Sequence, residues 1–213
     1  MSKSVYSVIL NDDLVAELDK AAYNNGVSRS AMLDRILAEY LTVETPVTRM
    51  ESIFSEMERL IGGWSGMKFV NQPSVSMASV QSALVYRYNP TVKYSVELFQ
   101  SGDDLGVIKM SLRTQNPVLI SLMESFYNFF IYLEAKYLGE RSYSYEDGRF
   151  SRVLKRADGL SAEKSGEAIA NFVRSVNFIL NQYISGLQEI DERKKEIENI
   201  YRKDIAPFIN ILR

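Results

Sequence analysis

Apolar and polar positions change their spacing twice within the first 45 residues of the chain. Residues 5–10 are β-prone, and alternation places three apolar side chains on one face, Tyr6, Val8 and Leu10. From residue 12 the apolar positions recur at helical spacing, with Asn11 as the predicted N-cap and Gly26 as the stop. Ser28 then caps a second helix, whose apolar face consists of Met32, Leu33, Ile36, Leu37, Tyr40 and Leu41.

These first 45 residues cannot enclose a hydrophobic core by themselves. One unpaired strand and two helices with wide apolar faces leave too much apolar surface in contact with water. Two copies would solve this problem if their strands paired as an antiparallel ribbon while four helices packed beneath it. The pattern therefore predicts a homodimer.

A larger domain is expected over residues 46–213. After a linker around Pro46 and an amphipathic helix, apolar alternation and turn residues predict a three-stranded antiparallel meander over residues 79–88, 92–99 and 107–113. A sheet with one apolar face needs helices packed against that face. The expected fold class is therefore α+β and α-rich, with an N-terminal dimerisation module over residues 1–45.

The helices that would cover this sheet follow it in the sequence. Asn116 and Pro117 begin a long helix that is apolar nearly all round and ends near Gly139. Ser161 begins a second long helix with a wide apolar stripe. A charged helix over residues 188–204 and a short final turn complete the expected elements.

The stretch from residue 4 to 45 resembles the ribbon-helix-helix family of the MetJ, Arc and CopG repressors. The resemblance covers about a fifth of the chain and rests on the strand, an L-x-x-x-L helix and the run GVSRSAM at residues 26–32. It implies a bacterial, repressor-like regulator of transcription that binds double-stranded DNA as a homodimer. The remaining domain would add oligomeric contacts or bind an unknown small-molecule or protein effector.

The resemblance also implies which residues would contact DNA. In that family the outward residues of the ribbon read base edges in the major groove, and by position these are Lys3, Val5, Ser7 and Ile9. The start of the second helix would bind a backbone phosphate through Ser28, Arg29 and Ser30, because a helix N-terminus is an anion site.

Charge leaves two interpretations of this module open. The chain has a net charge of −2, and its first 45 residues hold four basic and seven acidic residues. Affinity for DNA comes largely from neutralising phosphates, so the acidic module and the uncharged strand disfavour tight binding. Either the module reads DNA weakly, through Val and Ile on thymine methyl groups, or it only dimerises an interaction protein.

Composition excludes several kinds of chemistry. The chain contains no Cys and no His, which removes disulfides, zinc sites, His-based triads and cysteine nucleophiles. No constellation of remaining side chains indicates an enzyme, and no cofactor or metal is expected. A weaker hypothesis is a small-molecule site on the polar face of the sheet or at the loop of residues 62–66.

One segment, RFSRVLKR, concentrates positive charge. Its basic residues are a candidate anion or phosphate patch, although a solvated connector is the favoured explanation: Arg149, Arg152, Lys155 and Arg156. The most apolar segment, residues 118–138, contains Glu124, Glu134 and Lys136, which are costly at a bilayer centre. We therefore expect a buried helix, no membrane partner and a cytoplasmic protein.

Overall fold

The computed structural model describes residues 4–70, 74–146, 149–209 and 212. The chain divides into two compact units, Met1–Arg49 and Met50–Arg213, and each is described by itself. The first unit contains α1, Asp12–Asn24, and α2, Arg29–Tyr40. Both predicted N-caps are confirmed, because the side chain of Asn11 accepts from the N–H of Asp13 and that of Ser28 accepts from the N–H of Ala31.

The predicted ribbon-helix-helix fold is wrong for this structure, because the described part of the first unit, residues 4–49, is helical and contains no strand. Residues 4–10 adopt no regular secondary structure and lie exposed. A strand needs a neighbour to accept and donate its backbone hydrogen bonds, and no other described segment provides one. The sequence pattern identified β-prone side chains here, but such a pattern does not supply a pairing partner.

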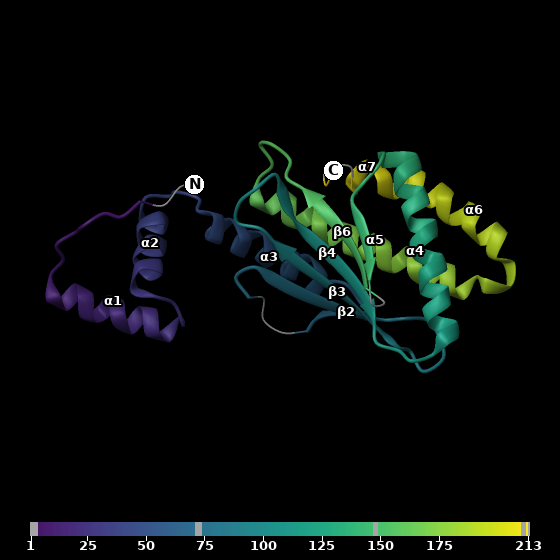
Figure 1. Ribbon diagram of the computed structural model, residues 1–213, viewed down its shortest axis with the longest axis horizontal. Helices are drawn as coiled ribbons and strands as arrows, with labels where there is room; N and C mark the ends of the chain where they lie inside the picture. The colour runs from purple at the N-terminus through teal and green to yellow at the C-terminus, as the bar shows by residue number, and fades with distance from the viewer. Residues whose placement is uncertain (1–3, 71–73, 147–148, 210–211, 213) are drawn as a thin grey trace. The chain divides into compact units, whose positions relative to one another are not determined.

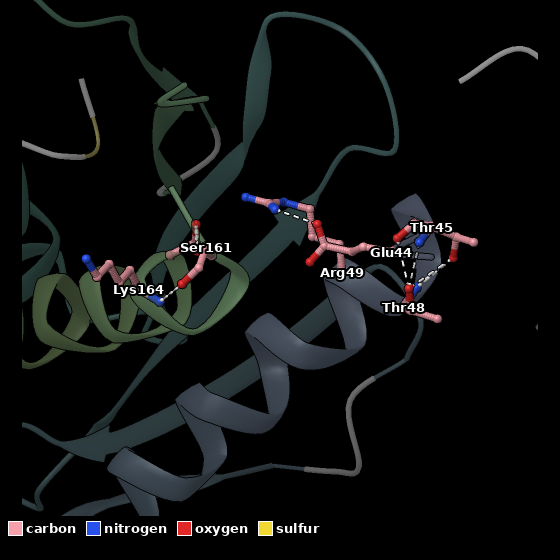
Figure 2. A network of polar contacts seen from close by, with 7 residues as sticks. Glu44, Thr45, Thr48, Arg49, Ser161 and Lys164 are labelled. Carbon is pink, nitrogen blue, oxygen red and sulfur yellow. Dashed lines mark hydrogen bonds and ion pairs between the residues drawn. The ribbon is translucent and has the colours of Figure 1, made fainter. Parts of the chain in front are cut away.

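The start of α3, Pro46–Gly62, is capped by two threonines. The N–H of Thr45 donates to Oγ1 of Thr48 over 2.9 Å, and the N–H of Thr48 donates to Oγ1 of Thr45 over 3.1 Å (Figure 2). This reciprocal arrangement satisfies two backbone donors that the first helical turn leaves without partners. Beside it, Nη1 of Arg49 lies 2.8 Å from Oε2 of Glu44.

The second unit is built on one six-stranded antiparallel sheet in the order β1-β2-β3-β4-β6-β5. The predicted three-stranded meander is therefore wrong, although its strands correspond to three adjacent members of this sheet. The six strands are β1, Met67–Phe69; β2, Met77–Ala83; β3, Thr91–Leu98; β4, Asp104–Leu112; β5, Tyr143–Glu146; and β6, Arg149–Lys155. The strand that the meander lacked beside β4 is the basic segment, because β6 pairs with β4 along its length.

Helices cover one face of this sheet. Alternate residues of the four long strands are buried on that face, and one row across it consists of Val80, Tyr94, Met110 and Phe150. They pack in one core with α3, α4 (Pro117–Leu138) and α5 (Ala162–Ser185), which lie on the same side of the strands (Figure 1). The opposite face carries half-buried polar residues such as Ser79 and Ser95, whose hydroxyl oxygens are 3.1 Å apart.

Two glycines permit close approaches within this unit. A Cβ atom on Gly106 of β4 would lie 2.1 Å from the carbonyl oxygen of Glu97 in β3. A Cβ atom on Gly166 of α5 would lie 2.6 Å from the carbonyl oxygen of Ile53 in α3. Both distances are far below van der Waals contact, so these positions accept only glycine without a shift of the backbone.

Helix α4 matches the prediction closely. Its N-cap is Asn116, Pro117 occupies the first turn and Gly139 follows its end with φ of 83°. Among the described helices it alone is long and apolar enough to cross a membrane, a test that core helices also meet. In this structure Phe126, Phe130 and Leu133 are fully buried in the core.

The C-terminal segment follows α5, whose N-terminus is capped by the Ser161 hydroxyl accepting from the N–H of Lys164 (Figure 2). A 3₁₀ turn, Leu187–Glu189, leads into α6, Ile190–Ile200, which continues as a π-helical turn, Tyr201–Ile205. The last helix, α7, is Ala206–Ile209. The sequence predicted a charged helix to residue 204 and a short final turn, but it did not indicate the π-helical turn.

Candidate interaction site

The first unit buries very little of its apolar surface. Among residues 4–49 the buried hydrophobic side chains are Leu18, Ala22 and Ala38. Thirteen large hydrophobic side chains of the same residues are exposed, against ten in the described part of the much larger second unit. The thirteen, which we call the N-terminal apolar surface, are Val5, Tyr6, Val8, Ile9, Leu10, Leu14, Tyr23, Val27, Ile36, Leu37, Tyr40, Leu41 and Val43.

The described residues that were expected to face DNA bases are exposed to solvent. Val5 is 99% exposed, Ile9 is 101% exposed and Ser7 is also exposed, while Lys3 lies outside the described residues. Their neighbours on the alternate face, Tyr6 and Val8, are exposed as well. The single chain therefore covers neither face of residues 4–10.

The expected phosphate-binding residues lie at the start of α2. Ser28 uses its hydroxyl to cap the helix, and Ser30 is exposed. Arg29 makes a bidentate contact with Asp19 of α1, with Nε–Oδ1 and Nη2–Oδ2 distances of 2.5 and 2.6 Å. This hydrogen bonding lowers the pKa of Asp19 and raises that of Arg29. The guanidinium charge is thus partly balanced within the chain.

The four basic residues near position 150 do not form one surface patch. Strand alternation points Arg152 into the core and leaves Arg149 and Lys155 exposed. Nζ of Lys155 lies 2.6 Å from Oδ1 of Asp104, and Nη2 of Arg156 donates to the carbonyl oxygen of Phe99 over 3.1 Å. Three of the four are therefore engaged within the second unit.

Arg152 takes part in a fully buried ion pair that links β6 to α4. Its Nε donates to Oε2 of Glu134 over 2.9 Å, and neither side chain has any exposed surface. The same carboxylate oxygen accepts from the hydroxyl of Tyr143 over 2.7 Å, and Nη1 of Arg152 donates to the carbonyl oxygen of Leu212 over 3.1 Å. The guanidinium also lies 4.9 Å from the ring centre of Phe172.

This cluster is shielded from solvent and holds structural elements together. Burial and the nearby Glu134 carboxylate raise the pKa of both Tyr143 and Tyr201, which keeps these phenols neutral. Both side chains of the pair are fully buried, and their contacts tie α4, β5, β6 and Leu212 together. Glu134 was expected only to be costly at a bilayer centre, but an acidic residue in a helix that is apolar on all sides also indicates a buried partner.

Two grooves of similar size lie on the second unit, besides a smaller one of about 210 Å³ beside Phe54, Glu58 and Ser74. One, with a volume of about 360 Å³, lies beside Gly66, Lys68 and Gln81, near the loop and polar sheet face identified from the sequence. The other, of about 350 Å³, lies between α5 and the π-helical turn, and the sequence did not indicate it. Within the residues that the structure describes, no group of three or more Asp or Glu side chains is placed to hold a metal ion.

Comparison with known proteins adds no independent guide to the role of these features. The chain matches no protein-family model, no curated protein and no solved structure.

Proposed function

We propose that two copies of this chain associate through the N-terminal apolar surface and that the dimer is a regulator that contacts double-stranded DNA. The observation that carries self-association is the exposure of thirteen large hydrophobic side chains on a unit of 49 residues. Soluble monomers rarely expose contiguous apolar patches of more than a few hundred Å². The binding partner that we propose for this surface is the same surface on a second copy of the chain.

The summed exposed area of these side chains is comparable with that of a stable interface. Full burial of a Val, Leu or Ile side chain contributes about 1.5–3 kcal/mol, and each Å² of buried apolar surface contributes about 25 cal/mol. Dividing the first value by the second gives roughly 60–120 Å² of apolar surface for each side chain. After allowance for partial exposure, the thirteen side chains together present on the order of 500–1,000 Å². A standard protein interface takes about 800 Å² from each partner.

Contact with DNA is the second part of the proposal. The supporting feature is the exposed start of α2 at Ser28–Ser30, which lies outside the N-terminal apolar surface and which a dimer would present twice. The Arg29–Asp19 contact favours a second candidate, in which the dimer binds another protein and not DNA. Both candidate functions require the dimer, and they differ only in whether the dimer binds DNA phosphates.

Sedimentation velocity tests self-association first. We expect a species of twice the chain mass, and we expect Val8→Asp to weaken association at least tenfold, because it places an unpaired charge on the apolar surface. The matched control is Val118→Asp, since Val118 is 60% exposed and Val8 is 66% exposed, but Val118 lies on the second unit. A wild-type chain that stays monomeric at high concentration would refute the proposal.

Fluorescence anisotropy with random genomic duplexes tests the DNA step. We expect binding at low salt that falls at least tenfold between 50 and 200 mM salt, as counterion release requires. Arg29→Glu should reduce affinity more than Lys20→Glu, which makes the same charge change at a side chain that is 69% exposed on the same unit. A dimer that does not bind duplex at low salt would exclude DNA contact and leave the second candidate.

A further inference from the structure

The groove between α5 and the π-helical turn has two walls of different origin. Its first wall consists of Asn171, Arg174, Ser175 and Phe178, which are spaced along α5 on the side away from the core stripe. Its second wall comes from Ile200, Asp204 and Ile205, where α6 continues into the π-helical turn. The volume of about 350 Å³ lies at the lower end of the range for small-molecule sites.

The π-helical turn shapes the second wall. The N–H of Ala206 donates to the carbonyl oxygen of Tyr201, five residues earlier, which widens the helix by one residue. Tyr201 and Ile205 remain buried while Asp204 is exposed. Single π-helical turns are rare and occur often at functional sites, because they displace side chains from regular helical positions.

Opposite charges line this groove without pairing. Arg174 and Asp204 form no ion pair with each other or with another described residue, although both border the same space. The Arg174 guanidinium lies 5.0 Å from the ring centre of Trp64, a stacking contact that orients its N–H donors. The walls thus offer an oriented cation on one side and a free carboxylate on the other.

We propose that this groove binds a small zwitterion with an amino-acid-like head and an apolar tail. Arg174 would bind the ligand carboxylate, and Asp204 would bind the ligand ammonium group. Each side chain carries the charge opposite to that of its ligand group, and neither is paired within the described chain. Phe178, which is 43% exposed, and the neighbouring isoleucines offer an apolar surface for the tail. This inference depends neither on self-association nor on DNA binding.

Three probes of one shape test the class of ligand. L-leucine carries both charges, 4-methylpentanoate lacks the ammonium group and 3-methylbutylamine lacks the carboxylate. Titration followed by NMR of the full-length protein should show saturable binding of L-leucine or another apolar amino acid. The two single-charge analogues should bind at least tenfold more weakly, because each leaves one wall charge without a partner.

Matched variants locate the site. Arg174→Gln and Asp204→Asn should each weaken amino-acid binding about tenfold. The controls Arg202→Gln and Asp191→Asn remove the same charges from residues of the π-helical turn and α6 that do not line the groove, and they should leave affinity within twofold. Thermal unfolding of each variant without ligand shows whether the fold is retained.

Three outcomes would overturn the proposal. One is the absence of binding by any apolar amino acid at concentrations near its solubility limit. A second is equal binding of 4-methylpentanoate and L-leucine, which would indicate a simple anion site. The third is an unchanged affinity in both groove variants, which would place any binding elsewhere on the chain.

Discussion

Replacing Arg152 with Met should lower the free energy of unfolding of the second unit by about 3–5 kcal/mol, because it leaves the Glu134 carboxylate buried without its cation. The paired atoms are 2.9 Å apart and both side chains are fully buried. Among the described residues, the Tyr143 hydroxyl alone would still donate to that carboxylate. For a domain of this size the loss corresponds to a fall in Tm of roughly 6–20 °C.

A matched exposed pair provides the control for this prediction. Nζ of Lys109 lies 2.8 Å from Oε2 of Glu97, almost the same separation, but these side chains are 43% and 40% exposed. Lys109→Met should therefore cost at most about 1 kcal/mol, because water screens that pair. Urea denaturation of both variants measures the difference in unfolding free energy directly.

The double variant Glu134→Leu/Arg152→Met separates loss of charge balance from loss of packing. Replacing both partners removes the desolvation cost as well as the attraction, so its stability should return to near the wild-type value or above it. If Arg152→Met costs no more than Lys109→Met, or if the double variant is as unstable as the sum of the single variants, the reasoning from burial is refuted.

Three further predictions concern local features. The contact with Arg29 lowers the pKa of Asp19, so its stabilising effect is fully present above the ordinary aspartate pKa and lost as pH falls through the lowered value. NMR titration should show the low pKa, and Arg29→Gln should return it toward the ordinary value. Gly106→Ala should destabilise the second unit by about 1–3 kcal/mol in urea, through overlap with the backbone of β3, whereas Gly62→Ala, with open space around its Cα, should have little effect. Ser161→Ala should cost about 1 kcal/mol by removing the N-cap of α5, as measured by the Tm.

Helix boundaries were predictable because their signals are local. Asn11, Ser28, Asn116 and Ser161 each cap the helix expected from the sequence. A cap acts on backbone groups two or three residues away, so neighbouring residues contain the necessary information. The alternation in β2, β3 and β4 was predictable for the same reason, since it records which residues face the core.

The number of strands in the sheet was not predictable, because it depends on contacts between residues that are distant in sequence. In β6 the inward positions are Phe150, Arg152 and Leu154, and the central arginine made this strand resemble a solvated connector. Its burial becomes favourable only with Glu134, eighteen residues earlier on α4. Residues 4–10 show the converse case, because β-prone side chains without a partner strand remain without regular structure.

The candidate groove was not predictable for a geometric reason. Arg174 and Asp204 are thirty residues apart, and each looks like an ordinary charge on the polar side of a helix. They border one space because the chain reverses after α5 and because a π-helical turn changes the direction of the residues after Ile200. Neither helical spacing nor composition indicates such a turn.

The outermost strands of the sheet also bear on how the protein avoids forming aggregates. At one border lies β1, with three residues, and at the other lies β5, with four. Strands this short expose few unpaired backbone N–H and C=O groups. An extended segment of another chain therefore has few hydrogen-bond partners at these edges. Fibril growth by strand addition is therefore discouraged at both borders of the sheet.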